Sequence, residues 1–186
     1  HYRETDKEYQ LNSIHQKEVA DLAEEYCRLS LLKDIVWLTG FHHDQGKNTV
    51  EWQEYFEKRI HGQEHGNGGK EDHSTLGGLV VEQDIPKTPL SELMQIAIYM
   101  HHGLMDCISA DDGKPLIWKR KQKYTQEQVK QVWSHARAER DCQKISDRYQ
   151  KAKTDLKKLA GQIEELANRE TKNRYGNRDF YLGMCE

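Results

Sequence analysis

The chain has 186 residues, a length typical of one domain, and a net charge of −3 with 35% hydrophobic and 32% charged residues. No apolar run approaches the roughly 20 residues of a membrane-spanning helix, and the first residues lack the apolar region of a secretion signal, so we expect neither. The four cysteines form no Cys-x-x-Cys pair, which favours reduced thiols and a cytoplasmic location.

The first third of the chain has the apolar spacing of three helices. Residues 9–29 repeat apolar positions every three or four residues, which predicts one inward face. The positions on this face are Leu11, His15, Val19, Leu22 and Tyr26. Residues 31–43 are apolar enough for a central helix that stops near Gly46, and residues 50–60 predict a helix with Trp52, Phe56 and Ile60 on one side.

The middle of the chain alternates loops with two helices. Residues 61–72 are rich in glycine and polar residues, which predicts a loop. A helix begins near His73, and its residues Leu76, Gly77 and Val80 are expected to face inward. Thr88 followed by Pro89 predicts the start of another helix, which runs to residue 102. The Asp-Asp-Gly sequence at 111–113 predicts a turn.

The last third is predicted to form one very long helix. Thr125 and Gln128 have the spacing of a capping box, and the apolar residues that follow alternate steps of three and four. The positions of this heptad stripe are Val132, His135, Ala138, Cys142, Ile145, Tyr149, Ala152, Leu156, Leu159, Ile163 and Leu166. So narrow a stripe explains the low apolar content, and it must pack on another helix of this chain or of a partner. Residues 179–186 predict a final helix.

Charge divides the chain into two parts. Residues 1–118 hold 11 basic and 21 acidic side chains, a net charge of −10, whereas residues 119–175 hold 16 basic and 8 acidic side chains, a net charge of +8. A basic segment suits an anionic partner such as nucleic acid. Two solvated surfaces of opposite sign would explain the pattern equally well.

Histidine is unusually frequent, with ten in the chain, and histidine or aspartate stands at four places separated by 28 or 29 residues. These places are His15, His43-Asp44, His73 and His101-His102. Each comes from a different predicted helix, and helices packed around one centre would bring them together. Imidazole with carboxylate suits Mn, Fe, Co, Ni or Zn, while the lack of paired cysteines argues against a closed structural zinc site. Singly, each histidine could be a core residue or a helix-end charge; together they favour a metal site.

The same residues carry a resemblance to a known family. His43-Asp44 with Gly46-Lys47 matches the His-Asp-x-Gly-Lys signature of the HD metal-dependent phosphohydrolase superfamily. With His15 upstream, then Asp72-His73-Ser74 and His101-His102-Gly103-Leu104, the chain resembles the HD nuclease domain of the helicase–nuclease of type I CRISPR systems. The resemblance covers roughly residues 1–120 and continues to the end, where residues 178–184 look most like the subtype C branch.

The resemblance implies a single all-α HD-domain helical bundle over residues 1–186. Residues 1–118 would form the metal-binding core, residues 119–175 a long basic helical arm, and the helicase domains would be absent. In the family pattern Asp44 bridges two divalent transition metal ions, with Mg as a further alternative. The first ion would be held by His15 and His43, and the second by His73, His101 and His102. Two such ions clamp the attacking and leaving oxygens of a phosphodiester.

Lys47 is the second catalytic candidate beside Asp44, because it would contact the scissile phosphate; a solvent-exposed lysine at a helix end is an equal alternative. Four other histidines are not expected in the site: His42, His61, His65 and His135. The family also places a late aspartate on the first ion, in a context that this sequence lacks. We therefore expect an incomplete first site and a second site that fills more readily.

The implied function is metal-dependent cleavage of single-stranded DNA, endo- or exonucleolytic, in CRISPR interference. A helicase would supply the strand after an RNA-guided surveillance complex opens the target, in the cytoplasm of a prokaryote and without a membrane partner. The basic segment from Lys119 onward would guide the strand. Two alternatives remain open. An HD nucleotide phosphohydrolase or phosphodiesterase predicts a closed pocket for a base, and an inactive truncated module would dock through the heptad stripe.

Overall fold

A computed structural model describes residues 2–3, 8–62, 72–103, 109, 113, 115–142 and 144–171. Apart from two short paired strands, β1 (Tyr2–Arg3) and β2 (Glu8–Tyr9), the described elements are helices, so the all-α class is confirmed. Most of the predicted loop 61–72, most of the turn at 111–113 and the whole helix at 179–186 lie outside the described residues. Within the described part, no helix has both the length and the apolar composition needed to cross a membrane.

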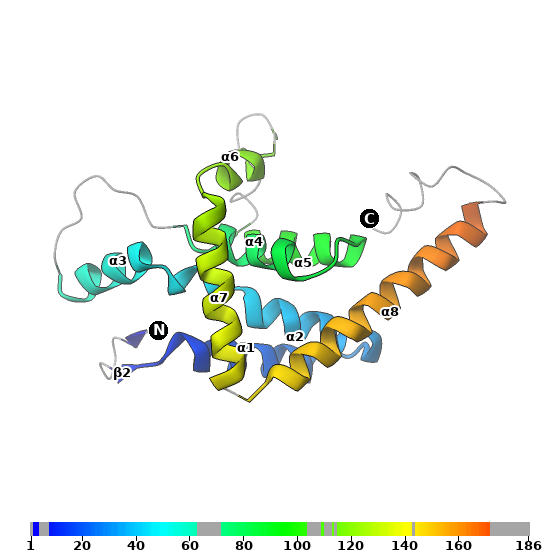
Figure 1. Ribbon diagram of the computed structural model, residues 1–186, viewed down its shortest axis with the longest axis horizontal. Helices are drawn as coiled ribbons and strands as arrows, with labels where there is room; N and C mark the ends of the chain where they lie inside the picture. Colours follow the sequence, from blue (N-terminus) through cyan, green and yellow to red (C-terminus); the bar gives the residue numbers. More distant parts are fainter. Residues whose placement is uncertain are drawn as a thin grey trace.

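The central element is α2, which contacts helices from both ends of the chain. Figure 1 shows α4 and α5 on one side of α2, α1 on the other, α7 crossing them, and α8 running obliquely from the lower end of α7 across the end of α2. In chain order the helices are α1 (Asn12–Tyr26), η1 (Ser30–Leu32), α2 (Lys33–His42), η2 (Gln45–Asn48), α3 (Val50–Ile60), α4 (Ser74–Asp84), α5 (Pro89–Tyr99), α6 (Ile117–Lys121), α7 (Gln126–Cys142) and α8 (Ser146–Thr171).

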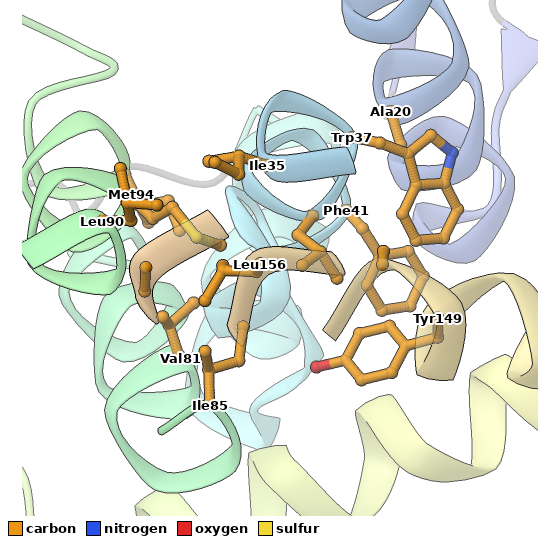
Figure 2. Packing of buried hydrophobic residues seen from close by; sticks show 14 of the residues in the cluster. Ala20, Ile35, Trp37, Phe41, Val81, Ile85, Leu90, Met94, Tyr149 and Leu156 are labelled. Carbon is orange, nitrogen blue, oxygen red and sulfur yellow. The ribbon is translucent and has the colours of Figure 1, made fainter. Parts of the chain in front are cut away.

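The main hydrophobic core joins the two differently charged parts of the chain (Figure 2). Trp37 and Phe41 of α2 stack with ring centroids 5.7 Å apart, and Tyr149 of α8 meets the Phe41 ring edge-on at 5.7 Å. Leu156 of α8 is fully buried in the same core. The heptad stripe of α8 therefore packs on helices of this chain.

The predicted inward face of the first helix is wrong. Leu11, Leu22 and Tyr26 are exposed, and the buried residues of α1 are Gln16 and Ala20. The cause is a close approach of α1 to α2, where a Cβ on Gly40 would lie 2.8 Å from the Cα of Ala20. Small side chains fit this contact, so the largest apolar residues do not mark the buried face.

The predicted single long helix is also wrong, because α7 ends at Cys142 and α8 begins at Ser146. Lys144 has a φ of 55°, and the amide of Ile145 donates to the carbonyl of Arg140 at 3.0 Å. This is the Schellman arrangement that usually places glycine at the left-handed position. A lysine at that position gives no sequence signal of a helix end.

The stripe is correct in the first part of α8, but Leu166 near the end of α8 is 56% exposed, and the stripe is shifted in α7. Ile145, Tyr149, Ala152 and Leu156 are buried as predicted. In α7, Val132 is buried as predicted and packs against α4 with Ala136, whereas His135 and Ala138 are exposed. Because the chain turns between the helices, one continuous repeat does not describe both.

Two local predictions matter for the site. The helix at 50–60 has the predicted bounds, and Thr88 and Ser91 cap α5 reciprocally. However, α5 ends at Tyr99, earlier than the predicted end at residue 102. His101 and His102 therefore lie in the turn after the helix. Side chains of adjacent residues within a helix point about 100° apart, and the turn removes this constraint.

Candidate metal centre

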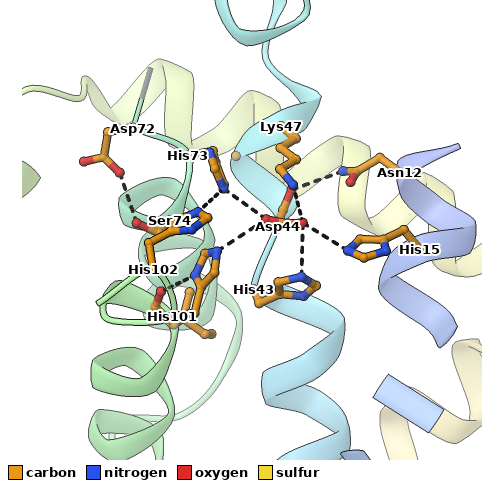
Figure 3. Close-up of polar contacts among 12 residues, drawn as sticks. Asn12, His15, His43, Asp44, Lys47, Asp72, His73, Ser74, His101 and His102 are labelled. Atoms are coloured by element: carbon orange, nitrogen blue, oxygen red, sulfur yellow. Dashed lines mark hydrogen bonds and ion pairs between the residues drawn. The ribbon is translucent and has the colours of Figure 1, made fainter. Parts of the chain in front are cut away.

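The four predicted histidine and aspartate positions come together around the Asp44 carboxylate (Figure 3). Asp44 and His43 follow the last turn of α2, and His15 reaches them from α1. From the other side come His73, directly before α4, and the pair that follows α5. The even spacing along the sequence thus reflects one ligand position from each of four packed segments.

One carboxylate oxygen faces each group of histidines. Asp44 Oδ2 lies 3.3 Å from His15 Nε2 and 3.1 Å from His43 Nε2. Asp44 Oδ1 lies 3.1 Å from His73 Nε2 and 3.6 Å from His101 Nε2. This division matches the bridging role that the resemblance implies for Asp44.

His102 completes the second group through His73. The Nε2 atoms of these two residues are 2.7 Å apart. Potential ligand atoms of His73, His101 and His102 all lie within 4.8 Å of one another, and the same holds for His15, His43 and Asp44. The geometry therefore offers two adjacent three-residue donor sets.

Backbone carbonyls fix the ring orientation of two of the histidines. His43 Nδ1 lies 2.6 Å from the carbonyl oxygen of Gly40, and His101 Nδ1 lies 2.7 Å from that of Ile98. A carbonyl only accepts, so each Nδ1 carries the hydrogen, and in the neutral ring Nε2 keeps its lone pair. Both lone pairs point at Asp44, which is the orientation of histidines that ligate a metal.

The buried atoms of the centre fit a divalent cation. Asp44 Oδ1 and His101 Nε2 are buried and have no hydrogen-bond partner among the described residues, although they face each other. Two unpaired acceptors in this position repel each other unless a positive charge lies near both. The imidazole and carboxylate donors suit Mn, Fe, Co, Ni or Zn, so the residues present fit the metal that the sequence predicts.

Asp44 is held in its ionised form. Burial alone would raise the pKa of this carboxyl, but attraction to the surrounding imidazoles, which are cationic when protonated, outweighs burial and holds the pKa well below its usual range. The ammonium of Lys47 also lies 2.5 Å from Asp44 Oδ2. Only 14% of the Lys47 side chain is exposed, so the lysine belongs to the centre rather than to the open surface.

Two glycines allow the segments to approach this closely. A Cβ on Gly46 would lie 2.1 Å from the carbonyl oxygen of His73, and a Cβ on Gly77 would lie 2.5 Å from that of His42. Any larger residue at either position would push α4 away from the end of α2. The glycine of the His-Asp-x-Gly-Lys motif thus has a packing role beside the ligands.

A polar network behind the centre was not predicted. The Asn12 amide donates to the backbone carbonyl of Asp44 at 3.1 Å and to Asn48 Oδ1 at 2.9 Å, and the Asn48 amide donates to Glu139 Oε2 at 3.3 Å. Burial raises the pKa of Glu139 to about 7, despite hydrogen bonds that lower it. No local signal marks Glu139, because it stands in a charged helix 95 residues after Asp44 in the sequence.

A partly buried ion pair fixes the start of α4. The Arg120 guanidinium donates to both carboxylate oxygens of Asp72, at 2.8 and 3.0 Å, and to the hydroxyl of Ser74 at 2.6 Å. Burial would raise the pKa of Asp72, but the bonds from Arg120 and Thr75 lower it well below its usual range. Arg120 was predicted to guide DNA, and here it holds the segment that carries His73.

The histidines outside the predicted set lie apart from the two donor groups. His42 is fully buried, its Nε2 lies 2.7 Å from the hydroxyl of Tyr149, and burial lowers its pKa to about 3. His61 and His135 are exposed and lie near Glu57 and Glu139, respectively. His65 lies outside the described residues.

The centre is open to solvent on its histidine side. The side chains of His15, His43 and His101 are 15–19% exposed, and His102 is exposed. The Asp44 side chain, in contrast, is only 2% exposed. A substrate could therefore reach the ligands from outside.

A comparison of the chain with protein-family models, with curated proteins and with solved structures finds no match.

Proposed function

We propose that this chain is a divalent-metal-dependent phosphodiester hydrolase of the HD type that cleaves single-stranded DNA. The observation that carries the proposal is the Asp44 carboxylate, which presents one oxygen to each of two histidine groups. The His-Asp-x-Gly-Lys motif and the order of the other histidines support the same family.

The residues of the centre have separate roles in this proposal. Asp44 is shared by both groups; His15 and His43 hold one ion, and the three remaining histidines hold the other. A pair of divalent ions bound there supplies Lewis acidity toward the phosphodiester and toward water. Lys47 brings an ammonium group to the same place, where it would stabilise the negative charge that develops on the phosphate.

The proposed partners follow from the resemblance. Helicase domains would deliver the strand, and an RNA-guided surveillance complex would select the target, so the hydrolase itself needs no sequence preference. The open histidine side of the centre agrees with a polymeric substrate better than with a mononucleotide in a closed pocket. A cytoplasmic location in a prokaryote belongs to the same proposal.

Asp44→Asn tests the proposal, because it keeps the side-chain size and removes the shared negative charge. We expect Mn²⁺ or Ni²⁺ affinity, measured by titration calorimetry, to fall at least about 100-fold, because a ligand common to both groups is lost. Degradation of circular single-stranded DNA should fall to background. Helical circular dichroism should stay unchanged, because the helices are held by the apolar core.

Asp147→Asn, the same substitution at an exposed position of α8, is the matched control and should leave both readouts unchanged. A chain that binds metal and hydrolyses nucleotides but no DNA strand would favour the nucleotide phosphohydrolase. Asp44→Asn protein with normal metal binding and normal cleavage would contradict the two-metal assignment.

A further inference from the structure

Helix α3 carries aromatic side chains that do not belong to the core. No residue of α3 is buried, and in Figure 1 the helix projects from the body next to η2. The half-buried rings of Trp52 and Phe56 stack with centroids 5.1 Å apart and planes at 15°. The two rings form a stacked aromatic pair, and this pair is an apolar surface outside the core.

This surface adjoins the metal centre. The Trp52 ring meets the His73 ring edge-on, with centroids 5.9 Å apart. The Lys47 ammonium also lies over the Trp52 ring, 5.5 Å from its centroid. Trp52 thus contacts one residue from the metal-binding group and the cation that we assign to the phosphate.

The start of α3 is fixed to the same segment as Asp44. The hydroxyl of Thr49 accepts from the amide of Trp52 at 3.2 Å, and the Gln53 side chain donates to the carbonyl of Lys47 at 2.6 Å. These bonds hold the helix to η2, which directly follows Asp44. The position of the rings relative to the centre is therefore built into the fold.

The charge on the aromatic side of α3 suits an anionic strand. At 100° per residue, Arg59 falls on the side of Trp52, whereas Glu54 and Glu57 fall on the opposite side of the helix. The Arg59 guanidinium donates to the hydroxyl of Tyr55 at 3.2 Å, which adds another ring to this side. The two glutamates instead line a surface depression with Asn48 and His61.

We propose that Trp52 and Phe56 are a stacking platform for the bases of single-stranded nucleic acid beside the scissile phosphate. The inference rests on the proposed hydrolase function and names the part of the substrate that the chain holds. Unpaired bases present their faces, and stacking on aromatic side chains is tolerant of sequence. A phosphate at the metal centre and a neighbouring base on the Trp52 ring would place the strand along α3.

The test compares a normal oligonucleotide with one in which the bases are replaced by abasic sites. Binding is measured by fluorescence anisotropy in Ca²⁺, and cleavage is measured separately in Mn²⁺. Trp52→Ala should weaken binding of the normal strand about 10- to 100-fold, the range for losing one stacked base. Binding of the abasic strand should stay unchanged, and Trp52→Phe should restore most of the lost affinity.

Tyr26→Ala is the matched control, because Tyr26 is 77% exposed on α1, outside the basic segment, and should leave both affinities unchanged. Equal losses on the normal and abasic strands for Trp52→Ala would overturn the platform. If the unaltered protein binds and cleaves both strands equally, the platform is wrong while the hydrolase stands. If the unaltered protein, loaded with metal, cleaves neither strand, the hydrolase proposal fails together with the platform that rests on it.

Discussion

Glu139 shows how a residue that contacts no ligand can still take part in the centre. Its carboxylate accepts a hydrogen bond from the side-chain amide of Asn48. The side-chain oxygen of Asn48 accepts in turn from the amide of Asn12, which also donates to the backbone carbonyl of Asp44. The side chain is only 9% exposed, and the imidazole Nδ1 of His135 lies 3.7 Å from its carboxylate. The protein therefore holds a costly acidic group in order to orient the segment that carries Asp44.

Glu139 should make stability depend on pH. Because the pKa of Glu139 is raised from 4.5 to about 7 in the folded protein, the folded state binds this proton more tightly than the unfolded state does. The contribution of Glu139 to stability is therefore greatest below pH 4.5 and is lost as pH rises through about 7. Relative to Glu139→Gln, we expect the unaltered protein to lose up to about 3 kcal/mol of unfolding free energy between pH 5 and 8.

Urea denaturation at several pH values measures this difference. Glu127→Gln, an exposed position on the same helix, is the control and should follow the unaltered protein at every pH. Parallel stability curves for the unaltered protein and Glu139→Gln would show that Glu139 titrates as an ordinary surface glutamate.

At the level of elements, the centre depends on how closely helices can approach. Gly46 lets η2 lie against the carbonyl of His73, and Gly40 lets α1 lie against α2. These contacts set the distances between ligands that come from different helices. The ligand types alone would not bring Asp44 and His73 within 3.1 Å.

Gly46→Ala and Gly161→Ala should change stability in opposite directions. The added methyl at residue 46 would lie 2.1 Å from the backbone carbonyl oxygen of His73. We therefore expect the free energy of unfolding to fall by about 3 kcal/mol and metal binding by the group that contains His73 to weaken. Gly161 lies within α8 and has no atom within 4 Å of the added methyl, so alanine should gain about 0.5–1 kcal/mol from helix propensity.

Thermal denaturation with and without Ni²⁺ measures both effects. The metal-induced increase in Tm should shrink for Gly46→Ala and stay unchanged for Gly161→Ala. A Gly46→Ala protein as stable as the original would mean that η2 can shift without cost.

The helices themselves were only partly predictable, for reasons that the structure makes clear. The bounds of α3 and the caps of α5 follow from local signals such as Thr49, Thr88 and Pro89. The turn at Lys144 lacks the usual glycine, so it was missed. The buried face of α1 is set by Gln16 and Ala20, whose burial depends on α2 and not on their own hydrophobicity.

The candidate ligand positions were predictable because metal-binding chemistry favours histidine and aspartate, and all six residues converge. The supporting residues were not, because asparagine, glutamate and glycine occur everywhere in the chain. Glu139 and Arg120 also approach the centre from parts of the sequence distant from the ligands they support. Only the packing of α7 and α6 against α4 identifies them.

Across the whole molecule, the two charged parts of the chain neutralise each other. Six basic residues after position 118 pair with acidic residues before it, so much of the predicted basic surface is used within the fold. These residues are Arg120, Lys121, Arg140, Arg148, Lys151 and Lys153. Strand binding would depend on the exposed lysines that remain.

Lys119 and Lys123 are the exposed lysines nearest in sequence to Arg120, which is tied to the segment before His73. Replacing both with glutamine should weaken binding of a single strand and reduce the slope of log affinity against log salt by about 1.4, since each phosphate contact on a single strand contributes about 0.7. Anisotropy titrations across a salt series measure the slope.

Lys87→Gln is the control, because this lysine is 86% exposed in the acidic part of the chain and should leave the slope unchanged. An unchanged slope in the double variant would mean that the region around α6 does not contact the strand.

The core shared by α2 and α8 has a consequence for how the protein is made. Every proposed ligand, from His15 to His102, leaves the ribosome before Tyr149 and Leu156, which complete the packing around Trp37 and Phe41. During synthesis these large rings therefore stay uncovered while more than forty further residues are added after the last ligand. The nascent chain carries the whole set of candidate ligands before it has the core that fixes them, so the candidate metal centre takes its shape only near the end of translation.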